Sequence, residues 1–448
     1  AGAQKGRVYE LLRSSSRLKL FSERAVRLQR LLEQLDSWDF DVFQAAETTG
    51  GFPLFLVAYN LMLVHNVIAP FGLNETVVRK ALHTIEAGYL RNPYHNSIHA
   101  ADVTQTMCYF ISKPFLLPYV TALEKLASII AAAIHDYAHP GVNNNFHVAA
   151  RLDLAIVYND RAVLENFHVS SFFQLMRRPD DNMFATMDAD MQKQIRQLII
   201  SMVLATDMAV HFDEVAKFKS KLIQVRRDMG RDDVGPSTPS SAARDDDGRK
   251  RSTASIAEKP RKKSVGNVAS AKEAPARRTS FIKTAADTDL FLRMALHTAD
   301  VSNPAKPIYL AKKWTEMVVE EFYAQGDRER DLGLPISAFM DRNTGNVPKL
   351  QLGFIDFIVK PLFEQWASVM DEVAEVCLPQ LLDVRAYWSR EQEAGARKGS
   401  VGSADAGSPA SRSARADPGS PASKLRIPPA AAVKEEDSMD AASEGSEH

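Results

Sequence analysis

Three separated stretches of the chain concentrate side chains that bind metals or transfer protons. His95 and His99 stand four residues apart, a spacing that places both on one face of a helix. His135 and Asp136 end a run of apolar residues, and Asp300 lies in a third stretch. Burying so many titratable groups is costly unless a partner compensates, and a divalent cation is the usual partner.

Each stretch taken alone has a simpler interpretation. Two histidines at helical spacing match easily by chance and often form an ordinary core or surface pair, and an adjacent His–Asp is a weaker signal still. Together, His99, His135, Asp136 and Asp300 supply two imidazole nitrogens and two carboxylates. This donor set suits zinc together with a harder second ion, so the joint pattern predicts a metal centre.

The elements that must bring these stretches together are predicted to be helices. From Trp38 to about Val225, and again from Asp287 to about Gln392, helical patterns are punctuated by Pro and Gly. Runs that alternate as strands do are no longer than a few positions. The sequence therefore predicts an all-α fold, with one large domain over residues 38–392.

The remaining segments differ in composition from this core. Residues 1–37 carry leucines at helical spacing among charged residues, which predicts an N-terminal amphipathic helical segment. Residues 230–286 are polar, basic and Ser-rich, and the tail 393–448 is rich in Ser, Ala, Gly and Pro. Such segments bury too little apolar surface to offset the entropy of ordering. We expect both to be disordered, with 230–286 forming a long surface insert of one domain.

Composition excludes several classes of partner. With 55 basic and 56 acidic residues the chain has no net charge to attract nucleic acid, so no nucleic-acid partner is expected. The most apolar stretch, residues 53–73, is interrupted by polar residues and proline, so no membrane span is expected. The two cysteines indicate a reducing compartment, hence a cytoplasmic location. Because the chain starts at Ala1, we expect a longer protein whose preceding region carries regulatory domains or an anchor to the cytosolic face of a membrane.

The chain resembles the class I 3′,5′-cyclic nucleotide phosphodiesterases in five motifs that occur in order. The resemblance extends over nearly all of residues 38–392 outside the insert, and it implies the compact multi-helix, HD-type catalytic domain of that family. A further similar run is Glu-Glu-Phe-Tyr-Ala-Gln-Gly-Asp at residues 320–327. The five shared motifs are residues 94–105, 135–145, 204–208, 297–306 and 351–363.

The resemblance implies a two-metal hydrolase. His99, His135, Asp136 and Asp300 would hold a tightly bound ion, usually Zn²⁺, and Asp136 would also reach a second ion, Mg²⁺ or Mn²⁺. A hydroxide bridging the two ions would attack phosphorus, because coordination lowers the pKa of water from 15.7 to about 7. The implied activity is hydrolysis of cyclic nucleotides to 5′-nucleoside monophosphates, which terminates cyclic nucleotide signalling.

The resemblance also assigns the proton donor. His95, which is not a ligand in the family, would protonate the departing O3′ oxygen. Glu321 would orient His95 and stabilise its charge, and His139 would contact metal-bound water. The simpler interpretation of each residue is a structural polar side chain.

A purine requires a flat apolar slot and an amide that pairs with its edge. The resemblance implies that Gln351 is that amide, that Phe354 and Val318 enclose the ring, and that Tyr94 also lines the site. Gln351 admits both cAMP and cGMP, because a glutamine amide both donates and accepts. Asn303 matches the cAMP-preferring members better, so cAMP is favoured, with cGMP or both left open.

The sequence leaves two other functions open and indicates one regulatory partner. One rival is a nucleotidase or triphosphohydrolase with the same metals, and another is an inactive relative that binds cyclic nucleotide. The run Arg-Arg-Thr-Ser-Phe in the insert resembles a site for a basophilic protein kinase acting at Ser280. Phosphate there would add about −1.5 to −2 charges to a basic segment.

Overall fold

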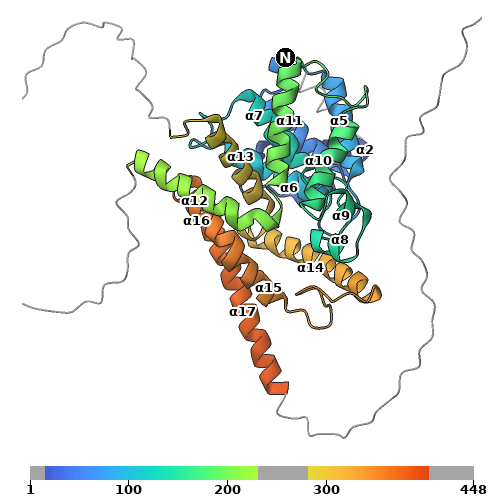
Figure 1. Cartoon of the computed structure of the whole chain (residues 1–448), viewed down its shortest axis with the longest axis vertical. Coiled ribbons are helices and arrows are strands. Elements are labelled where there is room, and N and C mark those ends of the chain that lie inside the picture. The colour runs from blue at the N-terminus through green and yellow to red at the C-terminus, as the bar shows by residue number, and fades with distance from the viewer. Residues whose placement is uncertain (1–15, 231–280, 403–448) are drawn as a thin grey trace, which may run out of the picture. The chain divides into compact units, whose positions relative to one another are not determined.

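A computed structural model of the chain describes residues 16–230 and 281–402. Within these ranges the regular secondary structure is entirely helical, which confirms the predicted all-α fold (Figure 1). Ser280, and most of the residues predicted to be disordered, lie outside the described residues. Within the described part, no helix has the length and apolarity needed to cross a membrane.

The first block of helices precedes residue 231. It comprises α2 (Ser16–Glu33), α3 (Val42–Thr49), α4 (Pro53–Val64), η1 (Ala69–Phe71), α5 (Glu75–Gly88), α6 (Ser97–Ser112), α7 (Ala122–Ile134), α8 (Asn144–Ala149), α9 (Asp153–Val157), α10 (Val163–Leu175), α11 (Ala189–Leu204), η2 (Met208–Val210) and α12 (His211–Asp228).

The second block follows residue 280. It comprises α13 (Ala285–Asp300), η3 (Asn303–Ala305), α14 (Ile308–Asp331), α15 (Val347–Phe354), η4 (Ile355–Val359), α16 (Lys360–Ala367), η5 (Val373–Cys377) and α17 (Leu378–Gly402). The described residues up to Ala396 belong to one compact unit.

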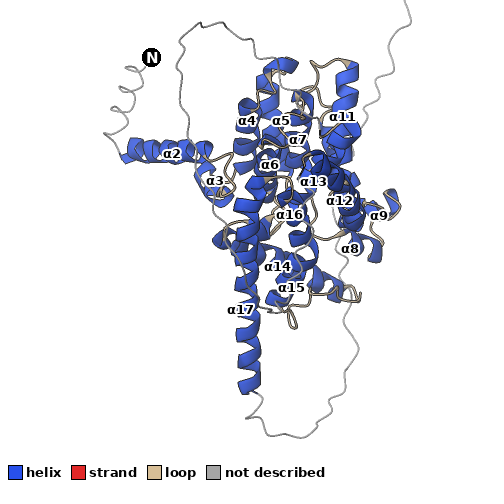
Figure 2. Ribbon diagram, turned by 90° about the vertical axis from the view of Figure 1, so that its left-hand side faces the viewer, coloured by secondary structure: helices blue, strands red, loops and turns tan. Residues whose placement is uncertain are grey.

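Helix α6 is the centre of the core. Every residue from His99 to Ile111 is buried, and α6 packs against α4, α7 and α13 (Figure 2). A helix that is buried all round needs its polar side chains satisfied inside the protein, because water does not reach them. The polar residues of α6 are therefore constrained to partners on neighbouring helices.

Three helix ends set the positions of the predicted metal ligands. Asn96 caps α6, and its side chain accepts hydrogen bonds from the N–H groups of Ile98 and His99, at 2.9 and 3.3 Å. Helix α7 ends at Ile134, immediately before His135 and Asp136, and α13 ends at Asp300. The ligand-type residues thus occupy the first turn of one helix and the ends of two others.

Aromatic packing joins the two blocks on either side of residues 231–280. Phe218 of α12 lies 5.4 Å from Phe291 of α13, and both rings contact Trp366 of α16. The indole N–H of Trp366 donates to Thr298 Oγ1 at 2.8 Å. Both blocks therefore contribute to the same core.

Helices α12 and α13 also meet at a pair of buried histidines. Nδ1 of His211 lies 2.7 Å from Nε2 of His297, and both side chains are buried. Burial, and then the repulsion between the two rings, lowers the pKa of His211 to about 4, and burial lowers the pKa of His297. A hydrogen bond between two imidazoles needs one neutral acceptor, so protonating the pair breaks it.

We expect the free energy of unfolding to fall as pH falls from about 6.5 towards 4. In this window the unfolded chain binds a proton at His211 and the folded chain does not, so protonation favours unfolding. Urea denaturation at pH 7.5 and pH 5 measures the loss. His211→Gln removes the titrating ring and should reduce the pH-dependent part, whereas an unchanged pH dependence in this variant would contradict the assignment.

Candidate active site

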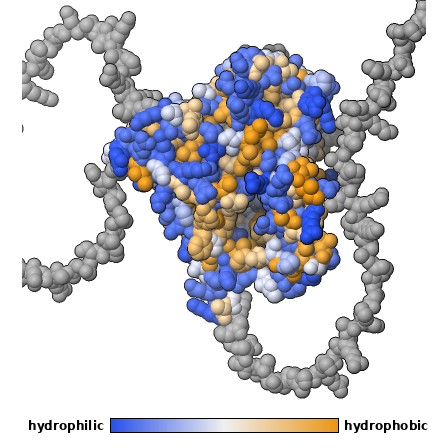
Figure 3. Space-filling view, in the orientation of Figure 1, coloured by the Kyte–Doolittle hydropathy of each residue, from blue (hydrophilic) through white to orange (hydrophobic). Residues whose placement is uncertain are grey.

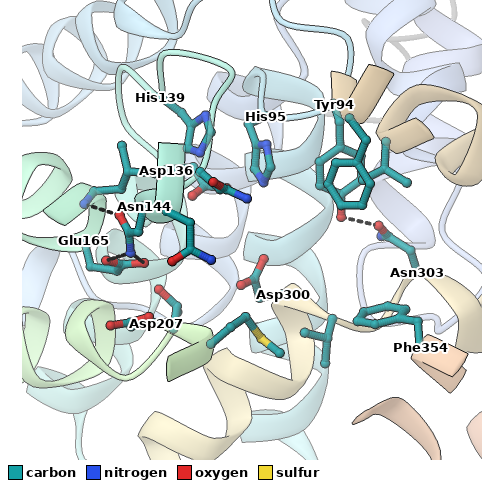
Figure 4. Close-up of a pocket in the computed structure, with 18 of the residues that line it drawn as sticks. Tyr94, His95, Asp136, His139, Asn144, Glu165, Asp207, Asp300, Asn303 and Phe354 are labelled. Atoms are coloured by element: carbon teal, nitrogen blue, oxygen red, sulfur yellow. Dashed lines mark hydrogen bonds between the residues drawn. The ribbon is translucent and has the colours of Figure 1, made fainter. Parts of the chain in front are cut away.

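The three predicted stretches meet at one cavity of about 670 Å³. Its walls include residues from the α6 and α7 ends, from α14 and from α15 (Figure 4). Part of its rim is apolar: Val148 lines the cavity, and apolar side chains gather over α8 and α9, where Val148, Ile156 and Val157 are exposed (Figure 3). A cavity with an apolar rim and a polar floor fits a ligand that is partly aromatic and partly charged.

The four predicted ligands converge at the floor of the cavity. His99 Nε2 lies 3.0 Å from Asp300 Oδ1 and 3.4 Å from Asp136 Oδ2. His135 Nε2 lies 3.1 Å from Asp136 Oδ2 and 3.3 Å from His99 Nε2. Both histidines are buried, while the two carboxylates face the cavity (Figure 4).

This cluster fits a divalent cation. One ligand atom from each of the four residues lies within 4.8 Å of all the others. His135 Nδ1 lies 2.9 Å from the carbonyl oxygen of Ala132, so Nδ1 carries the proton in that contact and Nε2 is left to face the cluster. Asp136 Oδ2 is buried, and although the two imidazoles lie 3.1 and 3.4 Å away, no residue of the described part of the chain makes a well-aligned hydrogen bond to it. Two nitrogens and two carboxylate oxygens are a donor set typical of zinc.

The charges within the cluster are strongly coupled. Burial opposes charge on His135, but the neighbouring carboxylates of Asp136 and Asp300 outweigh it and raise the pKa of this imidazole well above its usual range. Burial likewise opposes the Asp136 carboxylate, yet His135 and His95 hold its pKa well below its usual range. The carboxylate of Asp136 is therefore held as an anion. A bound metal cation can supply the positive charge that protons on the histidines would otherwise provide.

His95 lies beside this cluster and makes different contacts. Its Nδ1 is hydrogen-bonded to Glu321 of α14, and the other oxygen of Glu321 accepts the N–H groups of Tyr94 and His95, at 2.8 and 3.0 Å. Burial opposes charge on this ring, but Glu321 and then Asp136 raise the pKa of His95 to about 9. Nε2 is the ring nitrogen that remains for the cavity (Figure 4).

The expected helical pairing of His95 with His99 does not form. Helix α6 begins at Ser97, and its cap residue Asn96 is extended, with φ −133° and ψ −179°, so His95 precedes the helix. An N-cap residue takes non-helical dihedrals, which interrupts the i, i+4 geometry that the spacing predicted. His95 is thereby turned towards Glu321, while His99 faces the cluster.

His139 stacks on His95, with ring centroids 4.0 Å apart. Its Nδ1 accepts a hydrogen bond from the Gly141 N–H at 3.0 Å. Burial, and then the positive charge of His95, hold the pKa of His139 well below its usual range. A neutral His139 therefore lies beside a protonated His95, and one of its neighbours is Asp136.

The residues predicted to contact the base belong to the wall of the same cavity, and the ring centroid of Tyr94 lies only 4.6 Å from that of His99 in the cluster. Tyr94, Asn303, Val318, Gln351 and Phe354 all line it. The hydroxyl of Tyr94 donates to Asn303 Oδ1 at 2.5 Å (Figure 4). Most of the predicted site residues thus line one cavity. The other three, His99, His135 and Glu321, are buried behind it and contact the lining residues Asp300, Asp136 and His95.

Several polar residues of the cavity were not predicted. Asn144 donates to both oxygens of Glu165, at 3.3 and 3.0 Å, and burial, followed by the charge of Asp207, raises the pKa of Glu165 to about 7. His168 Nε2 lies 3.8 Å from Asp136 Oδ1. Two features of the sequence could have indicated these residues. Glu165 and His168 are titratable side chains in a mostly apolar helical run, and Asp207 belongs to a shared motif, residues 204–208, to which no role was assigned.

Comparisons with known proteins identify the family of this chain. A family profile for 3′5′-cyclic nucleotide phosphodiesterases matches residues 94–381. The human dual specificity calcium/calmodulin-dependent 3′,5′-cyclic nucleotide phosphodiesterase 1B is 37% identical over 354 residues, covering 79% of this chain and 54% of the relative. The mouse 1C enzyme of the same description is 34% identical over 378 residues, covering 84% and 45%. This chain spans about half the length of these relatives.

The fold has a solved counterpart. The crystal structure of the phosphodiesterase domain of the RhoPDE fusion protein from the choanoflagellate Salpingoeca rosetta superposes with a TM-score of 0.64 and 26% identity, covering 87% of this chain and 99% of that domain. Because the profile covers most of the described residues and the likeness extends through both blocks of helices, this chain belongs to the class I 3′,5′-cyclic nucleotide phosphodiesterase family.

Proposed function

We propose that this chain hydrolyses 3′,5′-cyclic nucleotides to 5′-monophosphates, with cAMP as the preferred substrate. The observation that carries the proposal is a single cavity that holds a His/Asp cation cluster, a histidine paired with a buried glutamate, and a base slot. The two cysteines are free and buried, which suits the reducing conditions of the cytoplasm.

The cluster fits two divalent cations. His99, His135, Asp136 and Asp300 would hold Zn²⁺, and Asp136, with His139 and His168 nearby, would face a second ion, Mg²⁺ or Mn²⁺. When bound, such a pair lowers the pKa of water to supply the nucleophile and polarises the phosphate oxygens.

His95 acts as the general acid. With a pKa of about 9 its ring is protonated near neutral pH, and Nε2 carries a proton towards the cavity. As the bond between phosphorus and O3′ breaks, this proton passes to O3′, so the leaving group departs as a neutral hydroxyl. Glu321 holds the ring by Nδ1 and stabilises its charged form.

The base slot contributes binding and choice of nucleotide. Phe354 and Val318 supply the apolar faces of the slot, and Gln351 supplies an amide that pairs with the edge of the purine. Asn303 also faces this part of the cavity, and hydrogen bonds at both ends of its side-chain amide fix the orientation of that amide.

The amide of Asn303 is fixed by its buried neighbours. Its Nδ2 donates to Asp102 Oδ2 at 3.2 Å, and Asp102 lies 3.6 Å from the buried ammonium group of Lys306. A carboxylate only accepts, so the amide nitrogen must face Asp102 and the amide oxygen faces Tyr94. An amide oxygen with a second lone pair, next to a hydroxyl oxygen, favours adenine, which carries an amino donor where guanine carries a carbonyl.

Asp136→Ala and Asp300→Ala should each abolish hydrolysis of cAMP and cGMP and lower the bound metal content, because each removes a donor from the cluster. Metal analysis by mass spectrometry and product detection as 5′-monophosphate measure both effects, with Mg²⁺ or Mn²⁺ present. Linear nucleotides serve as the control substrates. Turnover of these in preference to cyclic nucleotides would contradict the proposal.

His95→Gln should lower kcat by about 10²- to 10⁴-fold and leave the metal content intact, because His95 donates a proton and is not a ligand. In the parent enzyme kcat should decline as pH rises through the pKa of His95. Glu321→Gln should move this decline to lower pH, since it removes the charge that favours the imidazolium. Loss of zinc from His95→Gln would show that the acid and ligand roles are wrongly separated.

Asp102→Asn should lower the ratio of kcat/KM for cAMP to kcat/KM for cGMP by about tenfold, because a side-chain amide accepts or donates and no longer fixes Asn303. Steady-state kinetics with both nucleotides measures the ratio. A ratio that stays at the parent value, in a variant that retains its metals, would contradict this role for Asp102.

A further inference from the structure

The polar face of α14 continues beyond Glu321 in two residues that have no role in the proposed reaction. Gln325 and Glu329 follow Glu321 at intervals of four, so the three side chains form a row along one face of the helix. Gln325 is 2% exposed and Glu329 is 3% exposed. A buried amide and a buried carboxylate need partners, and these partners are Asn143 in the cavity wall and Ser337 in the segment between α14 and α15.

Glu329 holds the segment that leads to the base slot. Its carboxylate accepts the N–H of Ser337 at 2.6 Å and the hydroxyl of Ser337 at 2.7 Å. Ser337 lies between α14 and α15, and α15 carries Gln351 and Phe354. Charge-assisted hydrogen bonds of this kind are stronger than neutral ones, so the carboxylate anchors this segment to the end of α14.

Gln325 connects Glu329 to the opposite wall. Its Nε2 donates to Glu329 Oε1 at 2.8 Å and to Asn143 Oδ1 at 3.1 Å, and its Oε1 accepts the Asn143 N–H at 2.9 Å. Asn143 lines the cavity and caps α8, accepting the Phe146 N–H at 2.9 Å. Asn143 follows the turn that carries His139, so these two hydrogen bonds connect Gln325 to the metal side of the cavity.

Backbone packing also holds the segment between α14 and α15 against α14. A Cβ atom at Gly326 would overlap the backbone carbonyl of Met340, so the segment between α14 and α15 lies directly against the helix backbone. Only glycine leaves room for this approach. The hydrogen bonds of Glu329 and the contact at Gly326 therefore fix the same segment at two places.

We propose that Gln325 and Glu329 are positioning residues, which fix the base-binding helix α15 relative to the metal-side turn of residues 139–143. This inference rests on the proposed function, because a cyclic nucleotide has to span both parts, with its purine in the slot and its phosphate at the cation cluster. A change in their separation weakens binding of the whole nucleotide more than it changes the chemical step.

Glu329→Leu and Gln325→Leu should each raise KM for cAMP about tenfold while kcat stays within about twofold and the bound metal is unchanged. Ser337→Ala, which removes one of the hydrogen bonds to Glu329, should raise KM about threefold. Glu329→Gln retains an acceptor oxygen and should partly restore the parent KM. The double variant of Gln325 and Glu329 should be less than additive, because the two side chains act through one network.

Arg342→Ala provides a matched control in the same segment. Arg342 lies on the solvent side and makes ion pairs with Glu320 and Asp327, at 3.1 and 3.0 Å. Exposed ion pairs of this kind contribute little, so this variant should keep the parent KM. An equal rise in KM for Arg342→Ala and Glu329→Leu would overturn the proposal. General loosening of the segment between α14 and α15 would then explain the rise in KM without a specific role for Glu329.

Hydrogen–deuterium exchange of the metal-loaded enzyme tests the coupling without turnover. Glu329→Leu should speed exchange in residues 141–146 as well as in 347–354, whereas Arg342→Ala should leave both unchanged. Faster exchange confined to residues 332–346 would overturn the inference. If Glu329→Leu does not fold, Glu329→Gln and Ser337→Ala take its place. If the parent enzyme leaves both cyclic nucleotides intact, the proposed function is wrong. The exchange rates would still show whether Glu329 couples residues 141–146 to residues 347–354.

Discussion

The most demanding constraint in this structure is the convergence of two buried imidazoles and two partly exposed carboxylates at the meeting point of three helix ends. The like-charged Asp136 and Asp300 are held close together because α7 and α13, whose ends carry them, both pack against the enclosed helix α6. The carboxyl ends of α7 and α13 both point at this cluster, and the partial negative charge of a helix C-terminus favours a cation. The protein core therefore builds a site whose electrostatics are balanced by positive charge from outside the chain.

Helix α14 relates this centre to the rest of the cavity. From Val318 to Glu329 a single face contacts, in order, the base slot, the pair formed with His95, the turn beside α8 and the segment before α15. A straight helix is a rigid spacer with a rise of about 1.5 Å per residue. In the proposed reaction, substrate recognition and proton donation would therefore both depend on this one rigid helix.

The sequence predicted the helical class and the ligand set because both depend on local patterns. Apolar periodicity marks buried helices, and His-Asp motifs combine rare residue types in short stretches. It placed His95 on the helix face because the four-residue spacing was considered without the local N-cap signal of Asn96, whose side chain starts α6 after His95. Phe354 could not be told from a core residue without the family resemblance, and Glu165 and His168 lay in a helical run with no motif of their own. Their roles arise only when segments distant in the chain meet.

The junction of α12 with α13 has a consequence for how this domain tolerates change. The two helices flank residues 231–280, and they are tied together by the packing of Phe218 on Phe291 and by ion pairs from Lys283 to Asp228 and from Lys221 to Asp287, each at 2.7 Å. Where both ends of a connection are held by the core, its closure entropy grows only with the logarithm of its length. The register of the catalytic helices therefore depends on these contacts between α12 and α13, and only weakly on the length of the chain that connects them.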